Sequence, residues 1–162
     1  MIRAKWSLPL LMLVLALASC VTPYTAPAPS PPASTESDAQ AKQFAPAQGK
    51  GNLYIQRASE LVIFGQPTPF AVTVDGREIG GIVPGMYYCL ELEPGRHTLS
   101  ASSEASIAHE TVTVEAGKSY FYQITNSKAA DNTVKLNLSY VFIEGMGKLM
   151  IQQSKRGQAA IE

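Results

Sequence analysis

Polar and apolar residues alternate through most of the chain after Gly51. Successive side chains of a strand point to opposite faces of a sheet, so this alternation predicts half-buried β-strands. The clearest case is residues 133–143, where Leu136, Leu138 and Tyr140 share one face and Lys135 and Asn137 share the other. The same reading predicts strands over 52–57, 70–74, 77–79, 86–92, 96–102, 109–114, 119–125 and 133–143, with a last extended segment over 148–153.

Turn signals separate these segments. Asp75-Gly76 lies between two alternating runs, and this dipeptide favours a two-residue hairpin turn because both central positions take positive φ. Pro84-Gly85, Pro94-Gly95 and Gly117 mark further turns. About eight short strands joined by such turns predict an all-β domain over residues 51–162, an antiparallel β-sandwich of the immunoglobulin/transthyretin-like kind.

The segment before this domain has a different composition. Residues 21–50 hold six of the eleven prolines and few aliphatic side chains. A segment that buries so little apolar surface does not offset the entropy of ordering. We therefore expect residues 20–50 to form a disordered Pro/Ala/Ser-rich tether with polyproline II character, reaching on the order of 90 Å when fully extended.

The first 19 residues resemble a lipoprotein signal peptide. Arg3 and Lys5 precede the apolar run LPLLMLVLAL, which is about half the ~20 residues needed to span a bilayer. The run ends in Leu17-Ala18-Ser19-Cys20, which matches the lipobox of bacterial lipoproteins: an apolar residue, two small residues and a cysteine. This resemblance implies cleavage before Cys20 and lipidation of its thiol, with two or three acyl chains holding the protein to a membrane.

The residues after Cys20 bear on its destination. Bacterial lipoproteins kept in the inner membrane commonly carry Asp directly after the cysteine, and Val21-Thr22 follow here. The resemblance therefore favours the periplasmic face of the outer membrane over the inner membrane. Thirteen basic and thirteen acidic residues balance, so charge gives no indication of a nucleic-acid partner.

Several motifs after residue 51 resemble one family of envelope domains. They are Val72-Thr73-Val74-Asp75-Gly76, the run from Leu92 to Leu99 (LEPGRHTL) and the run from Val112 to Tyr122 (VTVEAGKSYFY). Together they are similar to the domain of unknown function 2846, and the Asp-Gly and Pro-Gly elements are shared with PEGA-type β-sandwich modules. The resemblance covers about residues 52–160. It implies a lipoprotein with a non-catalytic β domain, and it transfers no active residue.

The chain offers few candidates for chemistry. His97 shares a predicted face with Leu99 and Ala101 and is expected to be a structural histidine bonded near the Pro-Gly turn, while His109 is expected to be solvated. Two histidines far apart in sequence are a weak metal signal, so we expect no metal and no cofactor. Cys89 has no disulfide partner if Cys20 is lipidated, and we expect a buried, unreactive thiol, with a reactive thiol as the alternative.

Two further groups of residues have both a structural and a functional interpretation. Glu91 and Glu93 share one strand face, but paired catalytic carboxylates need a common pocket that separates their pKa values, so we expect them to be solvated. Half of the five tyrosines at 87, 88, 120, 122 and 140 must fill the core. The remainder could form a stacking face for a carbohydrate.

These observations favour a non-enzymatic envelope lipoprotein whose β-sandwich is an interaction or structural module. Its expected partners are a membrane, through lipid on Cys20, and an envelope protein or peptidoglycan. Two alternatives stay open: a module that binds peptidoglycan or another glycan, and a hydrolase with an unrecognised site. A flat apolar patch would favour a protein partner, and a concave aromatic groove a glycan.

Overall fold

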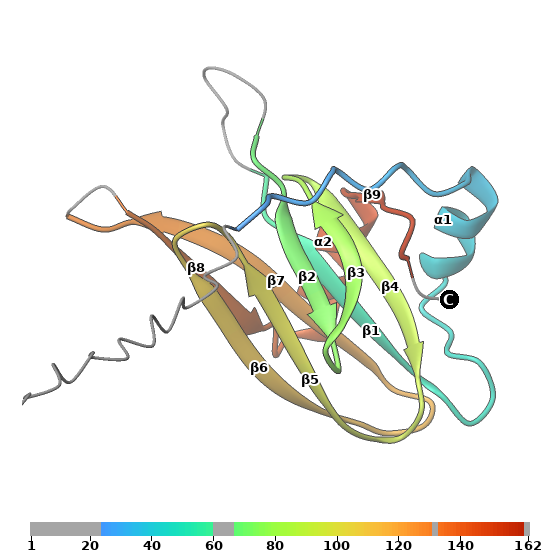
Figure 1. The fold of residues 1–162 in the computed structure, drawn as a ribbon. Coiled ribbons are helices and arrows are strands. Elements are labelled where there is room, and N and C mark those ends of the chain that lie inside the picture. The colour runs from blue at the N-terminus through green and yellow to red at the C-terminus, as the bar shows by residue number, and fades with distance from the viewer. Residues whose placement is uncertain (1–23, 60–66, 131–132, 161–162) are drawn as a thin grey trace, which may run out of the picture.

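The computed structural model describes residues 24–59, 67–130 and 133–160. They form two packed sheets with two short helices on one outer face (Figure 1). The elements in chain order are α1 (Thr35–Ala41), β1 (Gly51–Arg57), β2 (Phe70–Val74), β3 (Arg77–Ile82), β4 (Met86–Leu92), β5 (Gly95–Ser102), β6 (Ile107–Val114), β7 (Ser119–Lys128), β8 (Val134–Tyr140), α2 (Glu144–Gln152) and β9 (Lys155–Arg156).

The two sheets confirm the predicted sandwich. One sheet has the order β8-β7-β1-β4-β9, and the other has the order β3-β2-β5-β6. Most neighbours are antiparallel, but β1 pairs in parallel with β7, and β4 with β9. The hairpin predicted at Asp75-Gly76 is present between β2 and β3, and both residues have positive φ (52° and 76°). That backbone geometry matches the right-handed twist of the flanking strands.

The main core lies between the sheets. It is built from the inward side chains that the alternation pattern identified, among them Leu53 and Ile55 on β1, Val72 on β2 and Leu99 on β5. All seven residues of β1 are buried, because β1 is a central strand whose outer face is covered as well. That outer face carries a second core beneath the helices, formed by Ala41, Tyr54, Tyr87, Cys89, Phe121 and Ile151.

One sequence prediction for this domain is wrong. Residues 148–153 are not an extended segment: they belong mostly to α2, in which a Glu144–Lys148 ion pair (2.6 Å) joins positions i and i+4. Gly145 and Gly147 are poor helix formers, each costing about 1 kcal/mol relative to alanine, so the local sequence indicated a turn. After α2, the short tail, which the sequence pattern also allowed to form a helical turn, contains β9 and an extended stretch.

The tether prediction is also wrong for its described part, residues 24–50, which lie against the sandwich. Residues 24–33, here called the strap, are drawn in blue in Figure 1 and pass over the ends of β2 and β3 to reach α1. The Ser30 amide donates to the Gly81 carbonyl (2.9 Å), and the Ala33 amide donates to the Arg156 carbonyl (2.9 Å). Proline-rich backbone thus finds its hydrogen bonds on other segments, which composition alone does not reveal.

Candidate interaction surface

The most exposed apolar side chains gather on and just before α2. Four of them, here called the apolar stripe, are Phe142 (86% exposed), Ile143 (65%), Met146 (55%) and Leu149 (53%). Met146 and Leu149 lie three apart on α2 and so share one face of the helix, while Ile143 is its extended N-cap and Phe142 directly precedes it. Large apolar side chains scattered singly are ordinary on a protein surface, but a contiguous group marks a site of interaction.

The opposite face of α2 holds the helix on the sheet. Ile151 is fully buried in the second core, and Gly147 lies directly on Phe121. A Cβ atom added at Gly147 would come within 2.5 Å of Phe121 Cγ, so the glycine is what allows this approach. Because α2 uses one face to dock, its other face is available to display the stripe.

An aromatic group adjoins the stripe. The Tyr140 ring meets the Phe142 ring edge-on at 4.9 Å and the Tyr122 ring at 5.4 Å, and Tyr120 lies 6.5 Å from Tyr140. Burial raises the pKa of Tyr122 to about 12, which marks the buried end of this group. Of the five tyrosines considered from the sequence, Tyr87, Tyr88 and Tyr122 fill the two cores, whereas Tyr120 and Tyr140 are half-buried.

A hollow of about 430 Å³ lies between α1 and β4, and its lining includes Cys89, Glu91 and Asn52. Asn52 is 3% exposed, and its Oδ1 atom has no hydrogen-bond partner among the described residues. Burial raises the pKa of the Cys89 thiol, so the thiolate form is disfavoured. Cys89 is therefore buried, as expected, and Glu91 is exposed at the edge of the hollow.

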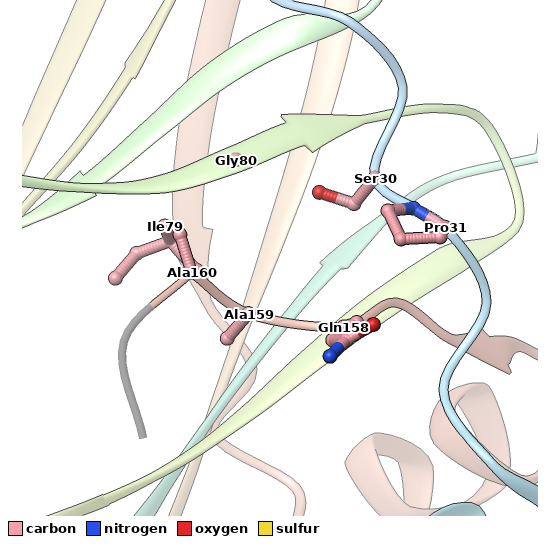
Figure 2. Close-up of a pocket in the computed structure, with 7 residues that line it drawn as sticks. All are labelled: Ser30, Pro31, Ile79, Gly80, Gln158, Ala159 and Ala160. Atoms are coloured by element: carbon pink, nitrogen blue, oxygen red, sulfur yellow. The ribbon is translucent and has the colours of Figure 1, made fainter.

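The shallow pocket in Figure 2, about 530 Å³, lies where the strap and the chain's last described residues cross β3. Ser30 and Pro31 come from the strap, Ile79 and Gly80 from β3, and residues 158–160 from the tail. The Ser30 and Tyr88 hydroxyls lie 2.7 Å apart. This lining holds no ionisable side chain, so we assign the pocket to strap packing rather than to chemistry.

The two histidines lie in different settings. His97 Nδ1 lies 2.7 Å from Asp75 Oδ2, and His97 Nε2 lies 2.9 Å from the Glu93 carbonyl, next to the Pro-Gly turn. Burial opposes protonation, but these two hydrogen bonds outweigh it and raise the pKa of the His97 imidazole. His109 is exposed, with its ring nitrogen 2.7 Å from the Ser100 hydroxyl. No cluster of three metal-ligating side chains occurs in the described ranges.

The remaining predicted site residues are dispersed or undescribed. Glu93 is exposed and lies 3.6 Å from Lys50, and it is not among the residues that line the hollow beside Glu91. Cys20, the predicted lipidation residue, lies outside the described residues, as does the predicted signal peptide over residues 1–19. Within the part of the chain that the structure covers, no helix has the length and apolar character to cross a membrane.

The structure defines an all-β sandwich that displays an apolar stripe. A comparison with protein families then places the chain: residues 47–136 match the family described as protein of unknown function (DUF2846), and the chain belongs to that family. The match confirms the resemblance to this family over residues 47–136, which include the three sequence motifs. It covers the sandwich from just before β1 into β8, and the stripe and strap lie outside it.

A relative in Haemophilus influenzae (strain ATCC 51907 / DSM 11121 / KW20 / Rd), described as an uncharacterized protein, is 34% identical over 92 residues. The aligned part is 56% of this chain and 53% of the relative, so the chain matches about half the relative's length.

Proposed function

We propose that this protein is a lipid-anchored protein of the bacterial envelope and that its β-sandwich is a non-catalytic module that binds another protein. The first half of the proposal rests on the sequence Leu17-Ala18-Ser19-Cys20 after a short apolar run. Val21-Thr22 after the cysteine favour the outer membrane, with the domain in the periplasm. The second half rests on the apolar stripe.

The stripe carries the protein-binding proposal because of its chemistry. Phe142, Ile143, Met146 and Leu149 are exposed beyond one half and supply aliphatic, aromatic and thioether surface. Full burial of one such side chain contributes roughly 1.5–3 kcal/mol, so covering the stripe would supply a substantial part of the free energy of association. Aromatic residues and methionine are also enriched at the centres of protein interfaces.

A glycan is the second candidate ligand, and the Tyr140–Phe142 pair is the observation that favours it. Sugar rings stack on exposed aromatic faces, but a sugar also needs polar groups to bond its hydroxyls. The four stripe side chains are all apolar, which supports a protein partner over a glycan.

A photoreactive amino acid at Leu149, introduced in living cells, tests the second half. We expect one discrete protein adduct, and we expect its yield to fall when Phe142→Ser removes another apolar side chain of the stripe. Adducts to murein fragments would favour the glycan candidate. No adduct at Leu149 in cells, in a protein that is folded and present at its normal level, would contradict protein binding.

Cys20→Ser tests the anchor. Without the thiol no acyl chain can be attached, so the variant should appear as unprocessed precursor or leave the membrane fraction. Processing and membrane retention equal to those of the unmodified sequence would contradict lipid anchoring.

A further inference from the structure

The strap is fastened to the sandwich at several separate points. At its start, the Tyr24 hydroxyl donates to the Ser102 carbonyl at the end of β5 (3.2 Å). In its middle, Pro29 forms a parallel bridge with Gly81 on β3, and Ser30 contacts the Tyr88 hydroxyl. At its end, Pro32 pairs with Gly157. Contacts with four separate segments (β5, β3, β4 and the tail after β9) hold this proline-rich stretch along its length.

The surface of β3 is shaped to receive the strap. Gly80 and Gly81 present bare backbone, and a Cβ atom added at Gly81 would come within 2.3 Å of the Ala28 carbonyl oxygen. A Cβ atom added at Gly80 would conflict with the Ser30 hydroxyl in the same way. Figure 2 shows the Ser30 side chain pointing toward Gly80. The glycine pair, which matches no phosphate-binding motif, is thus accounted for by close approach of the strap.

The chain after the strap is fastened too. The Tyr54 hydroxyl donates to the Ala41 carbonyl (2.7 Å), and the Tyr87 hydroxyl donates to Asp38 Oδ1 (2.7 Å), so α1 is tied to β1 and β4. Residues 24–50 therefore do not serve as a spacer. The first strap contact is made by Tyr24, and three residues separate it from Cys20 in the sequence: Val21, Thr22 and Pro23. The four Cα–Cα steps from Cys20 to Tyr24 span at most about 14 Å.

We propose that the sandwich is held directly at the bilayer surface, with the end that carries the β5–β6 turn facing the lipid headgroups. This inference rests on the proposed lipid anchor at Cys20. Tyr24 contacts Ser102, the residue at which β5 enters this turn, so the start of the strap and the turn lie at the same end of the sandwich. The partner of this end is the headgroup layer of the membrane that holds the lipid.

The chemistry of that end is compatible with a headgroup layer. Ile107, at the start of β6, is 62% exposed and presents an apolar side chain. The Ser106 hydroxyl accepts from the Leu136 amide (3.0 Å), so the β5–β6 turn and the start of β8 form one continuous end. Lys128 and Lys135 are exposed there. Their ammonium groups can reach lipid phosphates while the alkyl parts of the same side chains remain near the acyl chains.

Spin labels at the two ends of β6 test this placement in the full, membrane-bound protein. A nitroxide label is attached to the new cysteine of Ile107→Cys or of Thr113→Cys, each made in a Cys89→Ala background. The lipid headgroups of the bilayer carry a nickel chelate, which relaxes nearby nitroxides. Both positions are exposed and lie about 20 Å apart along one strand. We expect nickel to enhance the spin relaxation of the nitroxide at position 107 several-fold more than that of the nitroxide at position 113.

Two further variants change the tether and leave the anchor in place. Gly81→Ala adds one carbon that conflicts with the Ala28 carbonyl, and six Gly/Ser residues inserted between Pro23 and Tyr24 lengthen the connection with the strap intact. Each should lower the Ile107 signal several-fold. Gly145→Ala, where the added carbon meets no atom within 4 Å, is the control and should leave the signal unchanged.

Equal relaxation at Ile107 and Thr113 in membrane-bound protein, or an Ile107 signal that neither tether variant lowers, would overturn the placement and leave the lipid anchor standing. Absence of the protein from the membrane fraction would overturn the anchor itself, and with it the placement.

Discussion

α1 and α2 cover the same outer face of the five-stranded sheet but differ in how they are held and in what they leave exposed. α1 is tied down by polar bonds: Tyr54 to Ala41, Tyr87 to Asp38, and Arg156 Nη1 to the Ser37 carbonyl (2.6 Å). α2 is held chiefly by Gly147 on Phe121 and by the buried Ile151. Only α2 carries large apolar side chains that are mostly exposed.

This difference indicates different roles for the two helices. α1 bonds the sheet through Ser37, Asp38 and Ala41, and it leaves no large apolar side chain in solvent, as expected of a helix that serves only as a cover. α2 and the two residues before it leave Phe142, Ile143, Met146 and Leu149 in solvent and gain no stability from them. We therefore interpret α1 as a structural cover and α2 as the platform that presents the stripe.

Gly147→Val should have the largest effect on stability. The added side chain conflicts with the buried Phe121 ring, and overpacking of this kind costs roughly 1–3 kcal/mol. Chemical unfolding measures the loss. Gly145→Ala is the matched control in the same helix, and it should hold or raise stability by up to about 1 kcal/mol. Equal effects of the two substitutions would contradict the docking of α2 through Gly147.

Tyr54→Phe should have the next largest effect, because it tests the polar attachment of α1. The change leaves the Ala41 carbonyl and the Asn52 Nδ2 group without their bonds to the buried hydroxyl. A buried polar group left unpaired costs roughly 1–3 kcal/mol. The comparison is Tyr120→Phe, whose hydroxyl bonds the Glu115 amide in an exposed setting where water can replace it. A smaller loss for Tyr54→Phe than for Tyr120→Phe in urea unfolding would contradict this account.

His97→Gln should change the pH dependence of stability by a smaller amount. The pKa of His97 is raised above 6.5 in the folded protein, so its contribution is present below pH 6.5 and is lost as the pH rises through the folded pKa. The pKa of Asp75 is lowered, because the hydrogen bonds from His97 and Thr98 outweigh the opposing effect of burial. The contribution of Asp75 to stability is therefore present above pH 3.8 and is lost as the pH falls through its folded pKa. Asp75 is well exposed, so solvent screening keeps the pair's effect below about 1 kcal/mol.

Thermal unfolding at pH 5.5 and pH 8 checks this prediction. The unmodified protein should lose melting temperature between the two values, and His97→Gln should lose less. His109→Gln is the control, because that ring contacts the Ser100 hydroxyl rather than a carboxylate. A pH dependence that persists unchanged in His97→Gln would show that the Asp75 pair is not its source.

Phe142→Ser should have the smallest effect on stability, within about 0.5 kcal/mol, since the side chain is 86% exposed. Ile151→Ser, on the docking face of the same helix, should cost at least about 2 kcal/mol because it opens a cavity and buries a hydroxyl. Circular dichroism during denaturant unfolding measures both. A large loss for Phe142→Ser would mean that the stripe serves the fold.

The strands could be predicted from the sequence because alternation and turn residues are local signals. The parallel pairing of β1 with β7 could not, since these strands lie more than 60 residues apart and nothing local specifies their contact. α2 was missed because Gly145 and Gly147 weaken the helical signal, and the reason for Gly147 is the ring of Phe121. The strap was missed because its partner surface, Gly80 and Gly81, lies on another strand.

The candidate surface was harder to predict than the fold. The sequence drew attention to histidines, a cysteine, glutamates and tyrosines, and the structure disperses the first three groups and buries most of the tyrosines. Only Tyr140 of these residues adjoins the stripe. The signal that could have found part of the stripe is the three-residue spacing of Met146 and Leu149, but it becomes recognisable only once the segment is known to be a helix.

The measurement that tests the central claim most directly compares the two helices by cross-linking in living cells. A photoreactive amino acid replaces Met146 on α2 in one strain and Ala39 on α1 in another, and both positions are exposed. We expect a discrete protein adduct at Met146 with a yield several-fold above that at Ala39, and its reduction by Phe142→Ser. Equal yields at the two positions, or adducts at Ala39 alone, would contradict the assignment of the apolar stripe as the binding surface.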